Sequence, residues 1–400
     1  MNKADIMDNL NNDQLLMVNS QLQEVEWKTL GEVAELKRGT TITAKTKTEG
    51  VIPVISGGKT PAYYNSEYNR EGETITVAGS GAYAGFVMYW NEPIYVSDAF
   101  SVKPKLENLN TKYVFHFLLN NQTWIHNLQK GSGVPHVYPK DLEKLLIPIP
   151  PLSVQKEIVR ILDTFTELTA ELTAELTARK KQYSYYREQL FSFDVEEVQC
   201  LPMGDESIGK FIRGGGLQKK DFTETGVGCI HYGQIYTYYG VYTDKTKSFV
   251  SEEFAKKARM AKHGDLVIAT TSENDEDVCK AVAWLGVEEI AVSSDACFYT
   301  HSLNPKYVAY FFQTEQFQKQ KRPFITGAKV RRVNADDLAK IKIPVPSPEE
   351  QARIVSILDK FDTITTSISE GLPKEIELRK KQYEYYRDLL LSFPKHNIEY

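Results

Sequence analysis

The chain has 400 residues, enough for two or more domains, and its apolar (42%) and charged (25%) fractions are those of a soluble globular protein. It contains no apolar run of about 18 residues, which excludes a membrane-spanning helix. The formal net charge of -5 taken alone argues mildly against a nucleic-acid-binding protein, but the distribution of charge along the chain matters more than its sum.

The first 23 residues are polar and acidic, and they have no counterpart elsewhere in the chain. They lack the basic start and the apolar stretch of a signal peptide, so we expect an N-terminal extension, 1–23, to which we assign no role. The four cysteines lie far apart and form no CxxC pair, which argues against a zinc site and a disulfide framework. We therefore expect a cytoplasmic protein with no metal site and no membrane partner.

Residues 24–150 are typical of an α+β domain. Short β-like runs within 74–97 are bounded by Gly, Pro, Asn or Asp, and residues 111–129 are the helical candidate. The loop Gly79–Gly85 superficially resembles a dinucleotide-binding loop. A strand follows it, however, and no helix N-terminus is available to hold phosphate, so we expect a hairpin.

Residues 151–195 form the predicted central spacer helix. Its apolar residues recur at roughly heptad spacing, which predicts a coiled-coil seam. Within it, the unit "TAEL" repeats across 166–178 and keeps its leucines near one face. Such a repeat is either a good helix-forming filler or a ruler of adjustable length, and its position between two domains favours the ruler. The seam residues are Ile158, Ile161, Phe165, Leu168, Leu172, Leu176, Tyr183, Tyr186, Leu190 and Phe193.

Residues 196–346 are typical of a second α+β domain, with strand candidates within 265–294 and a helical candidate at 305–320. The acidic run 273–277 either touches a cation or is a solvated loop, and we favour the loop. The whole chain lacks a P-loop, a GxSxG elbow and an HExxH motif, so we predict no catalytic residues.

Residues 347–400 form the predicted C-terminal spacer helix. Ser347 is the expected N-cap, with Pro348 at the first helical position. Gly371 and Pro373 both disfavour a helix and should interrupt this one. Its seam residues are Ile354, Ile357, Phe361, Ile364, Ile368, Tyr383, Tyr386, Leu390 and Phe393.

The chain is a tandem duplication. Residues 147–165 match 343–361, residues 179–193 match 379–393, and the mixed blocks match more weakly, as "VSDAF" does with "VSSDACF". Two matching stripes in one chain most simply bury each other. We therefore predict an α+β fold in which two tandem α+β domains are separated by two long helices that form an antiparallel coiled-coil rod with pseudo-twofold symmetry.

Basic residues gather on Gly- and Pro-containing loops, and this distribution favours DNA binding. The loops 129–137 and 324–333 occupy matching places before the two spacer helices. Lys and Arg on such loops suit contacts with phosphates and base edges, although an ordinary solvated surface is the alternative for any single loop. The candidate DNA-binding residues are Lys37, Arg38, Lys45, Lys47, Lys59, Tyr63, Tyr64, Lys130, His136, Arg213, Lys219, Lys220, Lys321, Arg322, Lys329, Arg331 and Arg332.

The duplicated segments "IPIPPLSVQKEIVRILDTF" and "RKKQYSYYREQLFSF", together with "TAELTAEL", resemble the specificity subunit of a type I restriction-modification enzyme. The resemblance covers nearly all of the chain from about residue 24. It implies two target-recognition domains, each reading one half of a bipartite, asymmetric site in double-stranded DNA. It also implies spacer helices that hold these domains apart and bind two modification subunits.

The same resemblance implies that this chain binds no cofactor and is not catalytic itself. The modification subunits carry S-adenosylmethionine and methylate adenine, and up to two motor-nuclease (restriction) subunits use ATP and magnesium. The recognition loops vary freely within the family, so the resemblance supplies no base contacts. The leading 23 residues depart from the duplicated pattern, and the resemblance assigns them no role.

The duplicated tyrosine-rich helix offers two similar docking surfaces for two copies of one partner. Tyr185 and Tyr385 lie off the seam and either face such partners or pack on the adjoining domain. Two other classes of protein remain as alternatives. An enzyme acting alone on DNA is opposed by the missing motifs. A rod-shaped adaptor that never touches DNA would be distinguished by a filter-binding assay at low and high salt.

Overall fold

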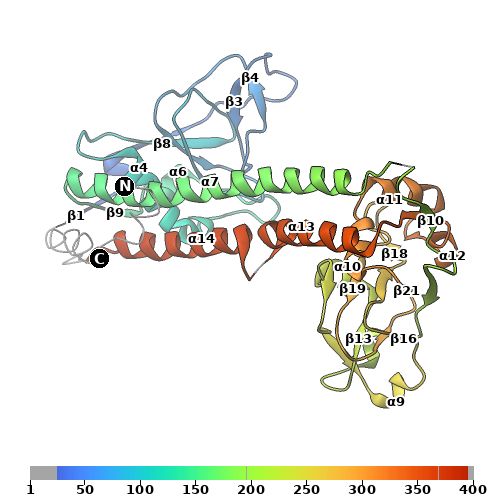
Figure 1. Cartoon of the computed structure of the whole chain (residues 1–400). Coiled ribbons are helices and arrows are strands. Elements are labelled where there is room, and N and C mark those ends of the chain that lie inside the picture. Colours follow the sequence, from blue (N-terminus) through green and yellow to red (C-terminus); the bar gives the residue numbers. More distant parts are fainter. Residues whose placement is uncertain (1–24, 195, 368, 395–400) are drawn as a thin grey trace. The chain divides into compact units, whose positions relative to one another are not determined.

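The computed structural model describes residues 25–194, 196–367 and 369–394 (Figure 1). The predicted N-terminal extension and Ile368 of the second seam lie outside the described residues. The chain forms two compact units. Unit 1 consists of two segments, one up to Thr173 and one from Glu375 onward, and unit 2 is the single segment from Ala174 to Lys374. Each unit thus combines one α+β domain with parts of both spacer helices. Within the described ranges, no helix has the length and apolar composition that a membrane crossing needs.

Unit 1 is built around an antiparallel sheet of order β2-β8-β5-β6. A smaller sheet has the order β4-β3-β7, with β3 and β7 parallel, and β1 pairs with β9. The strands are β1 (Glu26–Thr29), β2 (Ala34–Arg38), β3 (Ile52–Ile55), β4 (Tyr63–Asn65), β5 (Thr74–Ala78), β6 (Val87–Trp90), β7 (Tyr95–Val96), β8 (Ala99–Pro104) and β9 (Leu146–Ile149). The helices of this domain are α3 (Leu30–Val33), α4 (Thr111–Asn120), α5 (Gln122–Asn127) and α6 (Pro139–Leu142).

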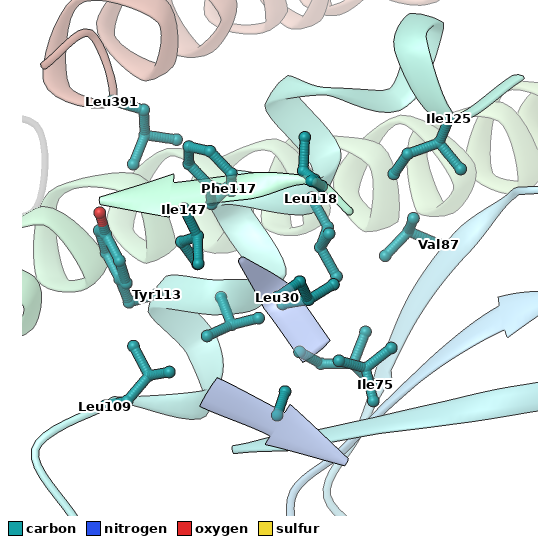
Figure 2. Packing of buried hydrophobic residues seen from close by; sticks show 14 of the residues in the cluster. Leu30, Ile75, Val87, Leu109, Tyr113, Phe117, Leu118, Ile125, Ile147 and Leu391 are labelled. Atoms are coloured by element: carbon teal, nitrogen blue, oxygen red, sulfur yellow. The ribbon is translucent and has the colours of Figure 1, made fainter. Parts of the chain in front are cut away.

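The core of unit 1 joins this sheet to the helices. The side chain of Asn110 caps α4 by accepting a hydrogen bond of 3.0 Å from the amide of Tyr113, which fixes where the helix begins. From α4, Phe117 meets Ile147 of β9 and Leu391 of the C-terminal segment, and all three are buried (Figure 2). Strand β5 is buried along its whole length because it lies between β8 and β6 and under α4.

Unit 2 repeats this plan with added strands. Its order β11-β21-β17-β19-β14 matches the main sheet of unit 1, and β12-β15-β13-β20-β16 contains the counterpart of β4-β3-β7, including its parallel pair. The strands are β10 (Cys200–Pro202), β11 (Gly209–Arg213), β12 (Phe222–Thr223), β13 (Val227–Ile230), β14 (Tyr242–Thr243), β15 (Ser248–Val250), β16 (Met260–Ala261), β17 (Leu266–Ala269), β18 (Thr271–Ser272), β19 (Ala281–Trp284), β20 (Ile290–Val292), β21 (Ala296–His301), β22 (Arg331–Arg332) and β23 (Lys342–Pro344). The helices are α8 (Tyr232–Thr237), α9 (Glu252–Ala255), α10 (Pro305–Phe311), α11 (Glu315–Lys321) and α12 (Ala335–Leu338), with 3-10 turns η1 (Lys219–Asp221) and η2 (Arg322–Phe324). The predicted tandem α+β fold is confirmed.

The long helices are α7 (Leu152–Leu190), α13 (Pro348–Thr366) and α14 (Gly371–Leu390). In unit 1, the start of α7 and the end of α14 run antiparallel side by side (Figure 1), and the ring of Phe165 stacks on that of Tyr386 with centroids 5.2 Å apart. In unit 2, the later part of α7 packs on α13, where Tyr183 and Tyr186 stack on Phe361 at 6.0 and 5.6 Å. The predicted seam between antiparallel helices is confirmed at these residues.

The predicted interruption of the second spacer helix is also confirmed. Gly371 is the first residue of α14, directly after the break, and has a φ of +77°; a Cβ at this position would lie 2.4 Å from the carbonyl oxygen of Thr363. Only glycine tolerates both conditions. Pro373 lies in the first turn of α14, where a missing amide hydrogen costs no helical hydrogen bond, so glycine makes the break and proline does not.

Gly79–Gly85 connects β5 to β6, which pair antiparallel. The loop therefore closes a hairpin, as predicted.

Candidate nucleic-acid interface

Each unit carries a short hairpin in the loop that precedes a spacer helix. Lys130 and His136 exchange backbone hydrogen bonds of 2.9 and 2.8 Å, and Thr326 and Arg332 exchange two of 2.9 Å. A glycine with positive φ follows the first residue of each pair, so the two loops turn in the same way. The matching positions expected from the sequence are confirmed, and both hairpin tips are exposed.

Polar cluster 1, in unit 1, comprises Arg38, Ser80, Asp98, His136 and Tyr138. The guanidinium of Arg38 lies over the ring of Tyr138, 5.3 Å from its centroid, and Tyr138 stacks on His136 at 6.0 Å. A backbone bridge joins His136 to Ser80, whose hydroxyl donates to the carboxylate of Asp98. A continuous series of contacts thus connects the guanidinium of Arg38 with the carboxylate of Asp98.

Polar cluster 2, in unit 2, comprises Arg213, Thr271, Asp295, Arg332 and Asn334. All five line one cavity of about 280 Å³. Thr271 and Arg332 face each other in the β18–β22 ladder, and Arg213 ends β11. The cavity brings together residues that are more than 100 positions apart in the sequence, so the sheet creates the site.

The two clusters occupy the same place in their domains. The amide after Arg38 donates to the carbonyl after Asp98 at 2.9 Å, and the amide after Arg213 donates to the carbonyl after Asp295 at 3.0 Å. The backbone carbonyls of Asp98 and Asp295 accept hydrogen bonds of 3.1 and 3.0 Å from the loops that follow β5 and β17. Both units therefore keep one arginine and one aspartate at equivalent positions, while the other three cluster residues differ.

A second arginine in each unit donates hydrogen bonds to the backbone at the cluster arginine. Arg70 donates to the carbonyl oxygens of Lys37 and Arg38 at 3.2 and 3.0 Å, and Arg259 donates to the carbonyl oxygen of Arg213 at 2.8 Å. These contacts fix the strand end from which the cluster arginine projects.

An ionic node anchors each domain to its spacer helix. In unit 1, the carboxylate of Asp163 accepts from Lys112 at 2.5 Å and contacts the buried ring of His116 at 3.0 Å. Burial raises the pKa of Asp163, but the hydrogen bonds from His116 and Lys112 outweigh it, so the net pKa is below its ordinary value. In unit 2, Asp359 accepts from Lys306 and from the hydroxyl of Tyr310, both at 2.7 Å.

Comparisons with known proteins agree with this duplicated architecture. Residues 23–179 and 206–378 match the family model of the type I restriction modification DNA specificity domain. The chain is 34% identical over 396 residues to the specificity subunit of the type I restriction enzyme EcoR124I/EcoR124II from Escherichia coli, covering 93% of this chain and 95% of that protein. The chain belongs to the family of type I restriction-modification specificity subunits.

Further matches point to the same family. A putative type I restriction enzyme specificity subunit from Haemophilus influenzae is 34% identical over 397 residues, covering 92% of this chain and 96% of that protein. The crystal structure of the S subunit from M. genitalium matches with a TM-score of 0.59 and 17% identity, over 94% of this chain and 98% of that one. The structural match supports the fold.

In this specificity subunit, four of the predicted DNA-binding residues lie in the two clusters: Arg38, His136, Arg213 and Arg332. Two others contact aromatic rings elsewhere in unit 1. The ammonium of Lys59 lies over the rings of Tyr83 and Phe86 at 4.8 and 5.2 Å, and that of Lys47 lies over Tyr63 at 5.7 Å. Seven further predicted residues are at least partly exposed: Lys37, Lys45, Tyr64, Lys219, Lys220, Arg322 and Lys329.

Several predicted DNA-binding residues have partners within the protein. Lys321 is fully buried, and its ammonium donates to the carbonyl oxygens of Glu276 and Val278 at 3.1 and 2.8 Å. We therefore remove it from the DNA-binding set, because it holds the loop before β19 in place. Lys130 and Arg331 form ion pairs of 2.6 Å with Asp141 and 2.8 Å with Asp275, and Tyr63 donates its hydroxyl hydrogen to the carbonyl oxygen of Ile42.

The sequence analysis missed six cluster residues: Ser80, Asp98, Tyr138, Thr271, Asp295 and Asn334. A signal for the two aspartates was present, because both lie in the repeated segment "VSDAF"/"VSSDACF". The search for basic residues passed over them.

Tyr185 and Tyr385 are 61% and 64% exposed, each in a T-shaped contact with the next tyrosine of its helix. Neither is buried against an α+β domain.

Proposed function

We propose that this chain is the DNA-reading, non-catalytic subunit of a type I restriction-modification complex, and that each unit binds one half of a bipartite, asymmetric target. One observation carries the proposal: the two units present equivalent polar clusters that share an arginine and an aspartate but differ in the residues around them. Shared residues suit a common docking geometry, and differing residues suit two different half-site sequences.

The exposed basic residues outside the clusters are proposed to contact phosphates. Lys37, Lys45, Lys47 and Lys59 have this role in unit 1, and Lys219, Lys220, Arg322 and Lys329 have it in unit 2. Such contacts fix the position of a protein on the duplex without reading its sequence. They concentrate positive charge locally on a chain whose net charge is -5.

The spacer helices are proposed to set the distance between the half-sites and to bind partner subunits. Tyr185 and Tyr385 are exposed at equivalent points of the duplicated helix, which suits two copies of one modification subunit. Up to two restriction subunits would complete the complex. S-adenosylmethionine, ATP and magnesium belong to these partners in the proposal.

Reconstitution tests the proposal. The chain and its modification subunits together should bind DNA with an affinity that falls steeply with salt, and they should methylate a bipartite site. The purified chain alone should neither methylate nor cleave DNA. Methyl transfer by the chain free of partner subunits would refute the non-catalytic role. Sequence-independent methylation by the full complex would refute the reading role.

A further inference from the structure

We propose that the arginine and aspartate shared by the two clusters read a G·C base pair in each half-site. The inference rests on the proposed function, because it requires each unit to bind DNA. The pairs are Arg38 with Asp98 and Arg213 with Asp295, and no other charged residues occupy equivalent positions in both clusters.

The position of the aspartates is the first argument. A carboxylate on a DNA-binding face is repelled by phosphates, so it needs a different reason to be there. Among the described residues, neither Asp98 nor Asp295 forms an ion pair within 4.0 Å, and Asp98 is exposed. Neither carboxylate is therefore occupied by a cation of its own unit.

The chemistry of the pair is the second argument. In the major groove, guanine offers the acceptors N7 and O6, and an arginine takes both with its two parallel N–H groups. The cytosine opposite offers its N4 amino group, and a carboxylate accepts from it. An arginine and a carboxylate side by side are therefore complementary to the two halves of one G·C pair.

The third argument comes from the backbone, because the arginine and the aspartate occupy the same positions relative to two paired strands in both units. Arg38 ends β2, while Asp98 directly precedes β8, the strand with which β2 pairs; Arg213 and Asp295 have the same relation to β11 and β21. The neighbours that differ, such as His136 in one cluster and Arg332 in the other, are then free to read different flanking bases.

The test uses the complete complex with Asp98→Ala or Asp295→Ala and maps the modified sites genome-wide. Alanine removes both carboxylate oxygens, so no acceptor is left for the cytosine amino group. Each variant should lower discrimination between G·C and A·T at one position of one half-site, by about 5-fold to about 150-fold, and should leave the other half-site unchanged. Glu107→Ala and Glu253→Ala, which remove exposed carboxylates outside the clusters, should leave both half-sites unchanged.

Three results would overturn the inference: a wild-type half-site without a G·C pair, an equal change of affinity for all sequences in either variant, or unchanged discrimination. A wild-type complex that modifies DNA without sequence preference would instead refute the proposed function, so the two failures are distinguishable.

Discussion

Unit 1 and unit 2 are most alike where their α+β domains meet the spacer helices. The side chain of Gln155 accepts from the amide of Asn110 at 2.8 Å, and that of Gln351 accepts from the amide of Asn304 at the same distance. The amides belong to the residues that cap α4 and α10. The equivalent lysine–aspartate pairs of the two ionic nodes lie close by.

The two units differ most at the hairpins and clusters. Unit 1 places aromatic rings, His136 and Tyr138, where unit 2 places Arg332 and Asn334. These side chains lie at an open surface and contribute little to either core. The comparison shows that the cluster residues differ between the units while the surrounding domain structure stays the same, because few core contacts depend on these residues.

Removing the node of unit 1 should have the largest effect on stability. Asp163→Ala leaves the 1% exposed His116 and the charge of Lys112 without their carboxylate. We expect the free energy of unfolding of unit 1 to fall by about 3 kcal/mol. Chemical denaturation should measure this loss of stability, and hydrogen exchange should show that it is confined to unit 1. Arg160→Ala, which breaks an exposed pair on the same helix, should cost less than about 1 kcal/mol.

The break between α13 and α14 has no counterpart in the continuous helix α7. A substitution at this break should have the next largest effect on stability. Gly371→Ala forces a side chain into a left-handed conformation and against the carbonyl of Thr363. The variant should lose about 1–2 kcal/mol in thermal or chemical denaturation. Gly133→Ala meets open space and is the control. Equal stability of the two variants would show that the break does not require glycine.

The next test exchanges the residues at equivalent positions of the two hairpin tips. Lys329 in unit 2 occupies the position of Gly133 in unit 1, and both positions are exposed. Lys329→Gly should weaken DNA binding on all sequences and reduce the salt slope by about one, and Gly133→Lys should increase it by about one. The measurement is the affinity of the complete complex between low and high salt. Unchanged slopes in both variants would make the tips ordinary surface.

The smallest effect concerns acidity. Burial raises the pKa of Asp362 above its ordinary value, and the matching residue of unit 1 is the uncharged Thr166. A raised pKa in the folded state means that ionisation of Asp362 lowers the free energy of unfolding. This loss of stability is complete above the folded-state pKa and vanishes below the unfolded-state pKa of about 3.9. Asp362→Asn should therefore stabilise unit 2 at pH 7 by less than about 1 kcal/mol, with no gain near pH 3.

The gain from Asp362→Asn is checked by denaturation at both pH values. Asp163 has the opposite shift, so Asp163→Asn should destabilise the protein at pH 7, with a loss that shrinks as the pH falls through the folded-state pKa. A stabilising effect of both substitutions at pH 7 would contradict the contrast between the units.

Repetition and spacing predicted most of the fold. The duplicated blocks, the helix break and the matching positions of the two loops before the spacer helices follow from local sequence, because glycine, proline and apolar periodicity act locally. Lys321 was misplaced because only its charge was considered. It follows the buried Phe317 by four residues and therefore lies on the core face of α11. Asp98 and Asp295 acquire their significance only when the sheet brings them beside arginines from a distant strand.

The central claim is that two independently reading units are held apart by the spacer helices. Deletion of one repeat unit, Thr169–Leu172, tests it most directly, since it removes four residues, or about 6 Å of helix. Genome-wide methylation mapping in cells carrying this variant should find the same half-site bases with a spacer shortened by one or two base pairs, at about 3.4 Å per base pair. An unchanged spacer in an active variant, or altered half-site bases, would contradict the claim.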